Sequence, residues 1–359
     1  MIIIETMTID PQLSDIDPAR LKGRSLPSSS TSAVDPFDSP RIAYPASWYY
    51  FGSVRELSGG PITRNLLGRQ LVGFLTKSGK PGVLSGRCVH MGSNLGAGCV
   101  IGESLQCALH NWRFSPSGRC EEIPAESEIP PFARQPSFPA QVRGGCVYFF
   151  NGPDPLFPLP FFDGFEPEQL VAARPFVEFL DCPWYMIGAN AVDVQHFAIA
   201  HDRRMERKPE VSYPSPYVHR TVCHFEVVGR SLSDRITRRF GGPNVRLEIV
   251  DWGGTMIFAR SVLAKTETFG IVSVVPLGAD RTMGHVIVMA RAGNGVVNRM
   301  LLDPLRALVR RTLIRTFLRS DVGRLTGTQY SPHTLIGIDD LFSEYFDWLK
   351  SLNRPKPVI

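Results

Sequence analysis

The chain has 359 residues, of which 43% are hydrophobic and 20% are charged, so it has the composition of a globular protein long enough for two domains. The net charge of +5 is too small to indicate a nucleic-acid partner, and no stretch approaches the ~20 apolar residues of a membrane-spanning helix. Four of the seven cysteines lie between Cys88 and Cys120, which indicates metal ligation in a reducing cytoplasmic compartment rather than a disulfide scaffold.

Turn-forming and apolar residues divide the chain into an arm and two domains. Residues 1–41 are rich in Ser, Pro and Asp and predict a flexible N-terminal arm. Short β-type runs separated by turn residues then predict a small all-β domain over 42–152. A proline-rich segment follows and marks the start of a second domain over 153–359. The clearest strands of the first domain are 71–76, 83–84 and 146–150.

The second domain has a mixed pattern, with a partly helical stretch over 180–201 and several strands within 211–295. Near its end, Asp303 and Pro304 have the residue types of a helix N-cap and a first helical position. The helix that follows has one apolar face, which we expect to cover a sheet while the arginines of the other face lie in water. A helix lying on a membrane surface is the alternative. The apolar face is Leu305, Leu308, Val309 and Leu313, and the basic face is Arg306, Arg310, Arg311 and Arg315.

Two short ligand pairs in the first domain have the spacing of a metal centre. Cys88 and His90 form a Cys-x-His pair, and Cys107 and His110 form a Cys-x-x-His pair. Two thiolates and two imidazoles suit either tetrahedral zinc or a [2Fe-2S] cluster with histidines on one iron. Structural zinc pairs usually leave two to four residues between ligands, so the single residue between Cys88 and His90 favours the cluster. Glycines nearby permit close backbone approach.

A second group of polar residues lies at the end of the partly helical stretch. His196 and His201 are five residues apart, and Asp193 lies three residues before His196. Residues five apart in an ideal helix point about 140° away from one another, so we expect a π-bulge, a break or a helix end between the two histidines. Asp193 has the spacing to orient the His196 imidazole. Taken alone, this pattern is weak evidence for a metal site.

Both cysteine-histidine loops resemble those of Rieske non-haem iron oxygenases. The matching stretches are Cys88-Val-His90-Met-Gly and Cys107-Ala-Leu-His110-Asn-Trp112, although family members often have Gly where Asn111 stands. The loops lack the extra disulfide of respiratory Rieske proteins. The resemblance implies an α+β chain, in which an all-β Rieske [2Fe-2S] domain is followed by a helix-grip (START-like) catalytic domain that holds a mononuclear Fe(II).

The same resemblance implies roles for the second group of residues. In this family iron is bound by two histidines and a downstream carboxylate, which makes His196, His201 and Asp321 the predicted metal ligands. Ser320 departs from the acid or amide that usually precedes the carboxylate. Asn190 and Asp193 are the candidate catalytic residues, with Asp193 expected to connect His196 to His110 of a neighbouring subunit in a homotrimer. The alternative carboxylate ligands are Asp339, Asp340 and Glu344.

By resemblance, the chain is expected to use O₂ to mono-oxygenate an apolar small molecule, aromatic ones included, by hydroxylation, N-oxidation or oxidative demethylation. Gln195-His196 and Asp321-Val322 resemble the aminopyrrolnitrin oxygenases, which act on arylamines. No Gly-x-Gly-x-x-Gly opens a helix after a strand, so electrons from NAD(P)H are expected through a separate reductase, with or without a ferredoxin. The alternatives are a ring cis-dihydroxylase, an electron carrier or binding protein without catalytic iron, and a zinc-stabilised regulatory protein.

Overall fold

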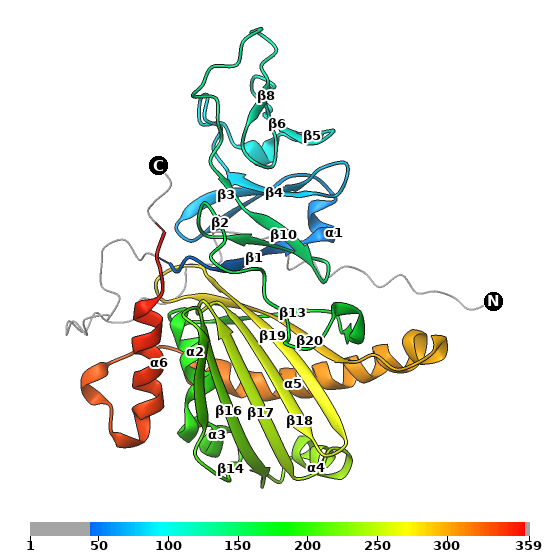
Figure 1. Ribbon diagram of the computed structural model, residues 1–359, viewed down its shortest axis with the longest axis vertical. Helices are drawn as coiled ribbons and strands as arrows, with labels where there is room; N and C mark the ends of the chain where they lie inside the picture. The colour runs from blue at the N-terminus through cyan, green and yellow to red at the C-terminus, as the bar shows by residue number, and fades with distance from the viewer. Residues whose placement is uncertain (1–43, 356–359) are drawn as a thin grey trace. The chain divides into compact units, whose positions relative to one another are not determined.

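The computed structural model describes residues 44–355, and the arm predicted over 1–41 lies outside them (Figure 1). Within the described part of the chain, no helix has the length and the apolar character needed to cross a membrane. The N-terminal part is made of short antiparallel strands, and the C-terminal part is one large antiparallel sheet with helices. The predicted α+β class, with an all-β region first, is confirmed.

Three small sheets form the N-terminal region, and the helices α1 (Val54–Leu57) and η3 (Leu95–Ala97) lie between their strands. The predicted strands over 71–76, 83–84 and 146–150 fall in β3, β4 and β11. The first sheet has the order β1 (Trp48–Ser53), β11 (Cys146–Phe150), β10 (Ala140–Arg143). The second has the order β2 (Ile62–Leu66), β3 (Arg69–Leu75), β4 (Pro81–Ser85), β9 (Ser137–Phe138). The third has the order β5 (Cys99–Ile101), β6 (Ser104–Gln106), β7 (Arg113–Phe114), β8 (Cys120–Glu122).

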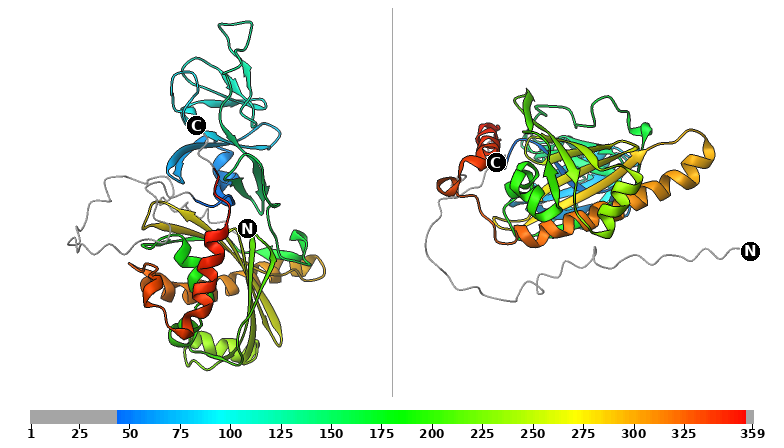
Figure 2. Two further views of the ribbon diagram at one scale, coloured as in Figure 1. Left: turned by 60° about the vertical axis from the view of Figure 1, so that its left-hand side comes forward. Right: turned by 90° about the horizontal axis from the view of Figure 1, so that it is seen from below.

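A nine-stranded antiparallel sheet dominates the C-terminal region, and the long helix α5 crosses one of its faces (Figure 1). This arrangement matches the predicted helix-grip domain. The strands are β12 (Leu170–Ala172), β13 (Phe176–Leu180), β14 (Arg203–Met205), β15 (Glu210–Ser215), β16 (Val218–Val227), β17 (Asn244–Trp252), β18 (Met256–Leu263), β19 (Thr266–Pro276) and β20 (Thr282–Arg291). The helices are η4 (Pro167–Gln169), α2 (Tyr185–Val192), α3 (Val194–His201), α4 (Leu232–Phe240), the π-helix η5 (Asn298–Leu302), α5 (Asp303–Leu325), η6 (Pro332–Thr334), η7 (Gly337–Asp339) and α6 (Asp340–Ser351) (Figure 2).

A buried hydrophobic cluster rich in aromatic residues joins the two regions of the chain. It includes Trp48 and Phe149 from the first region and Phe258 and Phe269 from the second. The Ser47 and Thr255 hydroxyls lie 2.7 Å apart at the same junction. The predicted boundary after residue 152 therefore divides the small sheets from the large one, but it does not divide the core.

Helix α5 begins differently from the prediction. Asp303 is the first residue of the helix rather than its N-cap, because the π-helix η5 runs directly into it. Its carboxylate is fully buried and accepts hydrogen bonds from the Gly293 N–H at 2.8 Å and from the Arg306 guanidinium at 3.1 Å. Pro304 is consequently the second helical residue. The Asp303 N–H still donates to the Asn298 carbonyl of η5, and Pro304, which has no N–H, ends that hydrogen-bond pattern.

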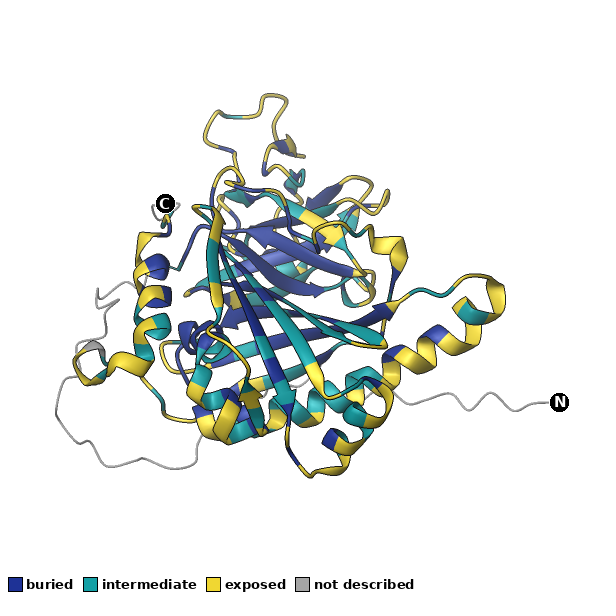
Figure 3. Cartoon of the chain, turned by 60° about the horizontal axis from the view of Figure 1, so that its bottom comes forward, coloured by how far each residue is buried: buried dark blue, intermediate teal, exposed yellow. Residues whose placement is uncertain are grey.

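The predicted buried face of α5 is also wrong. Leu305, Leu308 and Val309 are 56%, 49% and 48% exposed, and Figure 3 shows exposed residues along this part of the helix. The face that meets the sheet carries Ala307, Ile314 and Leu318 together with arginines, and Leu313 of the predicted face is partly buried. The Arg310 Nε donates to the backbone carbonyl of Glu267 at 3.1 Å, and the Arg315 Nε lies 3.0 Å from the Glu178 carboxylate. Long arginine stems pack on apolar surface while their guanidinium groups reach polar partners, so these residues do not mark the solvent face.

A fully buried carboxyl lies between the large sheet and α6. The Tyr345 hydroxyl of α6 donates a hydrogen bond of 2.6 Å to the Asp251 carboxylate, near the end of β17. Burial raises the pKa of Asp251 from 3.8 to about 7, although the hydrogen bond from Tyr345 opposes this rise. The folded chain therefore keeps a proton at pH values where the unfolded chain has lost it.

This proton makes stability depend on pH. The free energy of unfolding is expected to fall by roughly 4 kcal/mol as the pH rises from about 4 to about 7, because the folded state binds the extra proton over this range. Asp251→Asn keeps the shape of the side chain but cannot ionise. The denaturant concentration at the unfolding midpoint of the variant, minus that of the wild-type chain, should increase as the pH rises from about 4 to about 7. Asp347→Asn, at an acid that is 72% exposed, is the matched control and should show a constant difference. A constant difference for Asp251→Asn would contradict the prediction.

Candidate cluster and metal sites

The two cysteine-histidine loops have the same backbone turn. In the first loop, the Gly92 N–H donates to the Cys88 carbonyl at 2.8 Å, and Gly92 has φ +71°. In the second, the Asn111 N–H donates to the Cys107 carbonyl at 3.0 Å, and Asn111 has φ +57°. Asn is among the few residues other than Gly that enter the left-handed region at low cost. The departure from Gly noted in the sequence at Asn111 therefore preserves the turn.

Thiols and imidazoles lie at different depths in these loops. Cys88 and Cys107 are 4% and 2% exposed, whereas His90 and His110 lie at the surface with their ring centroids 4.7 Å apart. Trp112 stacks on His90 at 4.4 Å between centroids, as expected for a packing residue of the cluster loop. Burial is the main cause that raises the pKa of the Cys88 thiol to about 11, and the neighbouring Cys107 raises it further. A thiolate at this position therefore requires a positive charge, which bound iron would supply.

A residue that the sequence analysis did not identify holds the first loop. Gln135 is 1% exposed, and its amide nitrogen donates to the carbonyls of Ser85 at 2.8 Å and Arg87 at 2.7 Å. Its amide oxygen accepts the N–H of Val89 at 2.9 Å. The side chain thus fixes the backbone on both sides of Cys88 from 46 residues away in the chain. No local spacing predicts such a contact.

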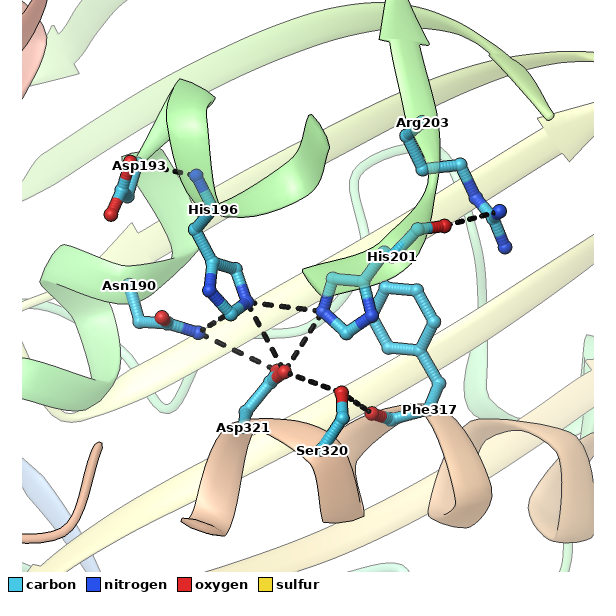
Figure 4. A network of polar contacts seen from close by, with 8 residues as sticks. All are labelled: Asn190, Asp193, His196, His201, Arg203, Phe317, Ser320 and Asp321. Atoms are coloured by element: carbon cyan, nitrogen blue, oxygen red, sulfur yellow. Dashed lines mark hydrogen bonds and ion pairs between the residues drawn. The ribbon is translucent and has the colours of Figure 1, made fainter. Parts of the chain in front are cut away.

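The structure brings His196, His201 and Asp321 together into one compact group (Figure 4). The two Nε2 atoms lie 3.0 Å apart, and the Asp321 Oδ1 lies 3.1 Å from the Nε2 of His196 and 2.8 Å from that of His201. Burial alone would raise the pKa of the Asp321 carboxyl, but hydrogen bonds to the two imidazoles hold it below its ordinary value. The ring of Phe317 stacks on His201 at 3.5 Å and fixes its plane.

The chemistry of this group fits a divalent metal ion. Adjacent ligands on one face of an octahedral ion, with bonds of about 2.1 Å, are separated by about 3 Å. The three observed separations of 3.0, 3.1 and 2.8 Å lie close to this value. Two imidazole nitrogens that face one another and a carboxylate need a shared cation or proton between them. The donor set is the two-histidine, one-carboxylate set typical of non-haem Fe(II).

Helix α3 supplies the two histidines of this group and α5 supplies Asp321, while α2 supplies the neighbouring Asn190. Asp193 separates α2 from α3 and caps α3, since its Oδ1 accepts the backbone N–H of His196 at 3.0 Å. Its carboxylate therefore contacts the backbone rather than the His196 imidazole that it was expected to orient. The Asn190 amide lies 3.4 Å from the Nε2 of His196 and 3.5 Å from the Oδ2 of Asp321. The Ser320 hydroxyl donates to Asp321 at 3.1 Å, in place of an acid or amide.

The predicted interruption between the two histidines is wrong. His196 and His201 lie in one continuous helix, α3, of which His201 is the last residue. Asp202 then leaves the helix in the left-handed conformation, with φ +51°. Both rings place their outer nitrogen, Nε2, toward Asp321, and the length of the side chains closes the gap that the helix geometry opens (Figure 4).

The alternative carboxylates have other partners. The Asp339 carboxylate accepts from the Gln195 amide at 2.9 Å, and Glu344 accepts from the Tyr213 hydroxyl at 2.6 Å. Asp340 lies in the first turn of α6. Among the described residues, Asp321 is the carboxylate that forms a potential metal-binding group with the two histidines.

An apolar cavity of about 300 Å³ opens beside the group, and His196, His201, Asp321 and Asn190 form part of its wall. Most of the other wall residues are aliphatic or aromatic and come from the central strands and α5. Such a cavity, with a few polar groups gathered at one place, is the usual form of a small-molecule site.

The turn at Asn111 can be tested without touching a ligand. Asn111→Val should destabilise the loop by about 1–2 kcal/mol, because a β-branched residue is strained at positive φ. The expected result is a lower unfolding temperature and partial loss of the visible absorption of a [2Fe-2S] cluster. Asn111→Gly is the matched control and should keep both at the wild-type level. Equal behaviour of the Val and Gly variants would contradict this account of the turn.

Comparisons with known proteins agree with this geometry. Residues 47–136 match the Rieske [2Fe-2S] domain. The chain is 32% identical over 152 residues to the tert-butanol monooxygenase / tert-amyl alcohol desaturase oxygenase subunit of Aquincola tertiaricarbonis, covering 41% of this chain and 32% of that one. It is 29% identical over 224 residues to the 3-ketosteroid-9-alpha-monooxygenase oxygenase component of Rhodococcus rhodochrous, covering 57% and 56%. The chain thus spans between a third and just over half of the length of these relatives.

The fold is shared over a longer stretch than the sequence likeness. Apo dicamba monooxygenase superposes with a TM-score of 0.65 at 16% identity, covering 86% of this chain and 97% of that one. The likeness includes both the small sheets and the large sheet with its helices. The chain is therefore a relative of Rieske oxygenase components, with a Rieske [2Fe-2S] domain followed by an α+β domain of the dicamba monooxygenase fold.

Proposed function

We propose that the chain is the oxygenase component of a Rieske non-haem iron monooxygenase that acts on an apolar small molecule. The observation that carries the proposal is the compact group of His196, His201 and Asp321 in the wall of an apolar cavity. Cys88, His90, Cys107 and His110 would hold the [2Fe-2S] cluster, and the compact group would hold Fe(II). Iron held this way supplies open positions for O₂ and accepts electrons from the cluster.

The reaction consumes external electrons. One atom of O₂ enters the substrate and the other leaves as water, with two electrons and two protons supplied for each turnover. The electrons would come from NAD(P)H through a separate reductase, with or without a ferredoxin. The exposed His90 and His110 give an electron donor access to the cluster edge. Hydroxylation, N-oxidation and oxidative demethylation all follow this balance, because each begins with insertion of one oxygen atom.

The remaining residues of the site act on the ligands. The Phe317 ring holds the plane of His201, and the Ser320 hydroxyl holds the Asp321 carboxylate. The Asn190 amide lies beside both ligand types, where it can donate a hydrogen bond to the Asp321 Oδ2. The aliphatic wall excludes water from the reacting atoms.

The proposal includes a cytoplasmic homotrimer, in which Asp193 of one subunit meets His110 of the next. Two features support this arrangement. His110 is exposed, and Asp193 uses Oδ1 for the helix cap while no partner of its Oδ2 is found in the described part of the chain. The Asp193 Oδ2 would orient the His110 ring, while its Oδ1 holds the backbone of His196.

Two other functions make different use of the site. An electron carrier would have no need of the His196–His201–Asp321 group or of the cavity. A ring cis-dihydroxylase would use both, and product analysis with ¹⁸O₂ separates it from a monooxygenase by the number of labelled atoms incorporated. The apolar cavity and the compact group favour an oxygenase over the carrier.

Counting iron and acid-labile sulfide in anaerobically purified protein tests the proposal. The wild-type chain should contain about three iron and two sulfide, and both His201→Ala and Asp321→Ala should contain about two iron with the cluster spectrum unchanged. The lost iron is the mononuclear one, because each variant removes one of its three ligands.

Asp339→Ala and Glu344→Ala are the matched controls, since both remove carboxylates that were candidate ligands and have other partners. They should keep about three iron. If the wild-type chain holds only about two iron even after Fe(II) is added, the oxygenase proposal is wrong and the electron carrier stands.

A further inference from the structure

The cavity beside the compact group is long and follows the strands of the large sheet. Four inward-facing residues of β18 line it in succession, at every second position: Ile257, Ala259, Ser261 and Leu263. Because a strand rises about 3.3 Å per residue, these four span about 20 Å. The cavity therefore has room for an elongated molecule rather than a compact one.

The compact group and a pair of hydroxyl residues mark different places along the cavity. Arg310 precedes Asp321 by eleven residues of α5, which is about 16 Å along the helix axis. The Arg310 Nε donates to the carbonyl of Glu267 at 3.1 Å. The next residue, Thr268, faces Ser261 across the β18–β19 ladder, and both line the cavity. Ser261 and Thr268 therefore lie in the half of the cavity remote from the compact group, one row short of the apolar end formed by Leu263 and Val245.

Two hydroxyl groups line the remote half of the cavity. Ser261 and Thr268 are half-buried, and neither hydroxyl has a hydrogen-bond partner within residues 44–355. Two of the charged residues of the cavity wall outside the compact group are in ion pairs: Glu178 with Arg315 at 3.0 Å and Arg203 with Asp234 at 2.8 Å. Arg310 has no acidic partner, but each of its three guanidinium nitrogens already donates to a neutral acceptor: the Glu267 carbonyl, the Arg306 carbonyl or the Thr266 hydroxyl. Hydroxyls donate and accept, so Ser261 and Thr268 suit an uncharged polar group. A carboxylate would lose its hydration and would have to displace these acceptors to reach Arg310.

Small residues keep the middle of the cavity open. Gly270 of β19 faces Ala259 of β18 in the ladder, between the Ser261–Thr268 pair and the next row of side chains. A Cβ added at Gly270 would meet only the backbone oxygen of Ala259, at 4.0 Å. The space above Gly270 is therefore not needed for packing, and a side chain there would cross the cavity.

We propose that this cavity binds an elongated, neutral molecule. Its apolar body lies over Ala259 and Gly270, and its far end carries one uncharged polar group, such as a hydroxyl or a carbonyl, that hydrogen-bonds to Ser261 and Thr268. The other end lies at His196, His201 and Asp321. Only the statement that this last end is oxidised rests on the proposed function.

Binding of straight-chain primary alcohols to the full chain, measured by calorimetry without reductant, tests the proposal. Affinity should rise about fourfold per methylene from 1-pentanol to 1-decanol. The double variant Ser261→Ala/Thr268→Val should weaken 1-decanol about tenfold through loss of its hydrogen bonds. Gly270→Phe should lower the affinity for 1-decanol at least tenfold and change the affinity for 1-pentanol by less than about twofold. Only the long chain must pass the middle of the cavity. Decanoate should bind more weakly than 1-decanol.

Three results would overturn the proposal: unchanged 1-decanol affinity in the double variant, unchanged 1-decanol affinity in Gly270→Phe, or tighter binding of decanoate than of 1-decanol. Iron content of each variant is the control for folding and should equal that of the wild-type chain. The two proposals fail separately. If the wild-type chain holds about two iron but binds the alcohols as expected, the oxygenase proposal alone is rejected. If it holds about three iron but the alcohol affinities differ from those expected, the substrate class alone is rejected.

Discussion

The buried carboxylate of Asp321 is the constraint on which the rest of the C-terminal domain depends. A carboxylate that is 7% exposed loses its hydration, and nearby positive or hydrogen-bonding groups must compensate for this loss. His196 and His201 supply these groups at 3.1 and 2.8 Å, but they lie about 120 residues earlier in the chain. Helix α5 must therefore cross the sheet at one angle and one depth. The arginine contacts to Glu178 and to the Glu267 carbonyl hold it there along its length.

The backbone geometry of the two N-terminal loops places the candidate cluster ligands. Two buried thiols must lie beneath two exposed imidazoles, and two equivalent turns with positive φ at Gly92 and Asn111 achieve this. The Gln135 side chain then fixes the first loop by three hydrogen bonds to the backbone. The result is a site whose cysteine side is dry and whose histidine side faces solvent. Such an asymmetry suits one-electron exchange at the exposed edge.

The sequence predicts the chemistry of this chain better than its packing. Ligand spacing identifies the four residues of the two loops, because each pair is close in the chain. The group of His196, His201 and Asp321 comes from the family resemblance, since Asp321 lies about 120 residues from the two histidines. The burial of α5 could not be read in the same way. The face with Leu305 and Leu308 is apolar, and so is the face with Ala307, Ile314 and Leu318. Contacts with strands 40 to 140 residues away, including those of Arg310 and Arg315, select the second face, and no local pattern encodes them. The contacts of Gln135 with the first loop likewise join residues far apart in the chain. The pairing of Ser261 with Thr268 depends on the register of β18 and β19.

The open cavity itself argues for a ligand. The apolar side chains around the cavity of about 300 Å³ have no packing partner on the side that faces it, so the open space lowers the stability of the domain. Larger aliphatic residues in place of Ala259 and Gly270 would fill much of it, since nothing in the structure opposes a side chain at Gly270. A chain whose task is only to carry electrons would gain stability from such residues. Retaining the space, with unpaired hydroxyls in one half and three potential metal ligands in the other, is explained when a bound molecule restores the missing contacts.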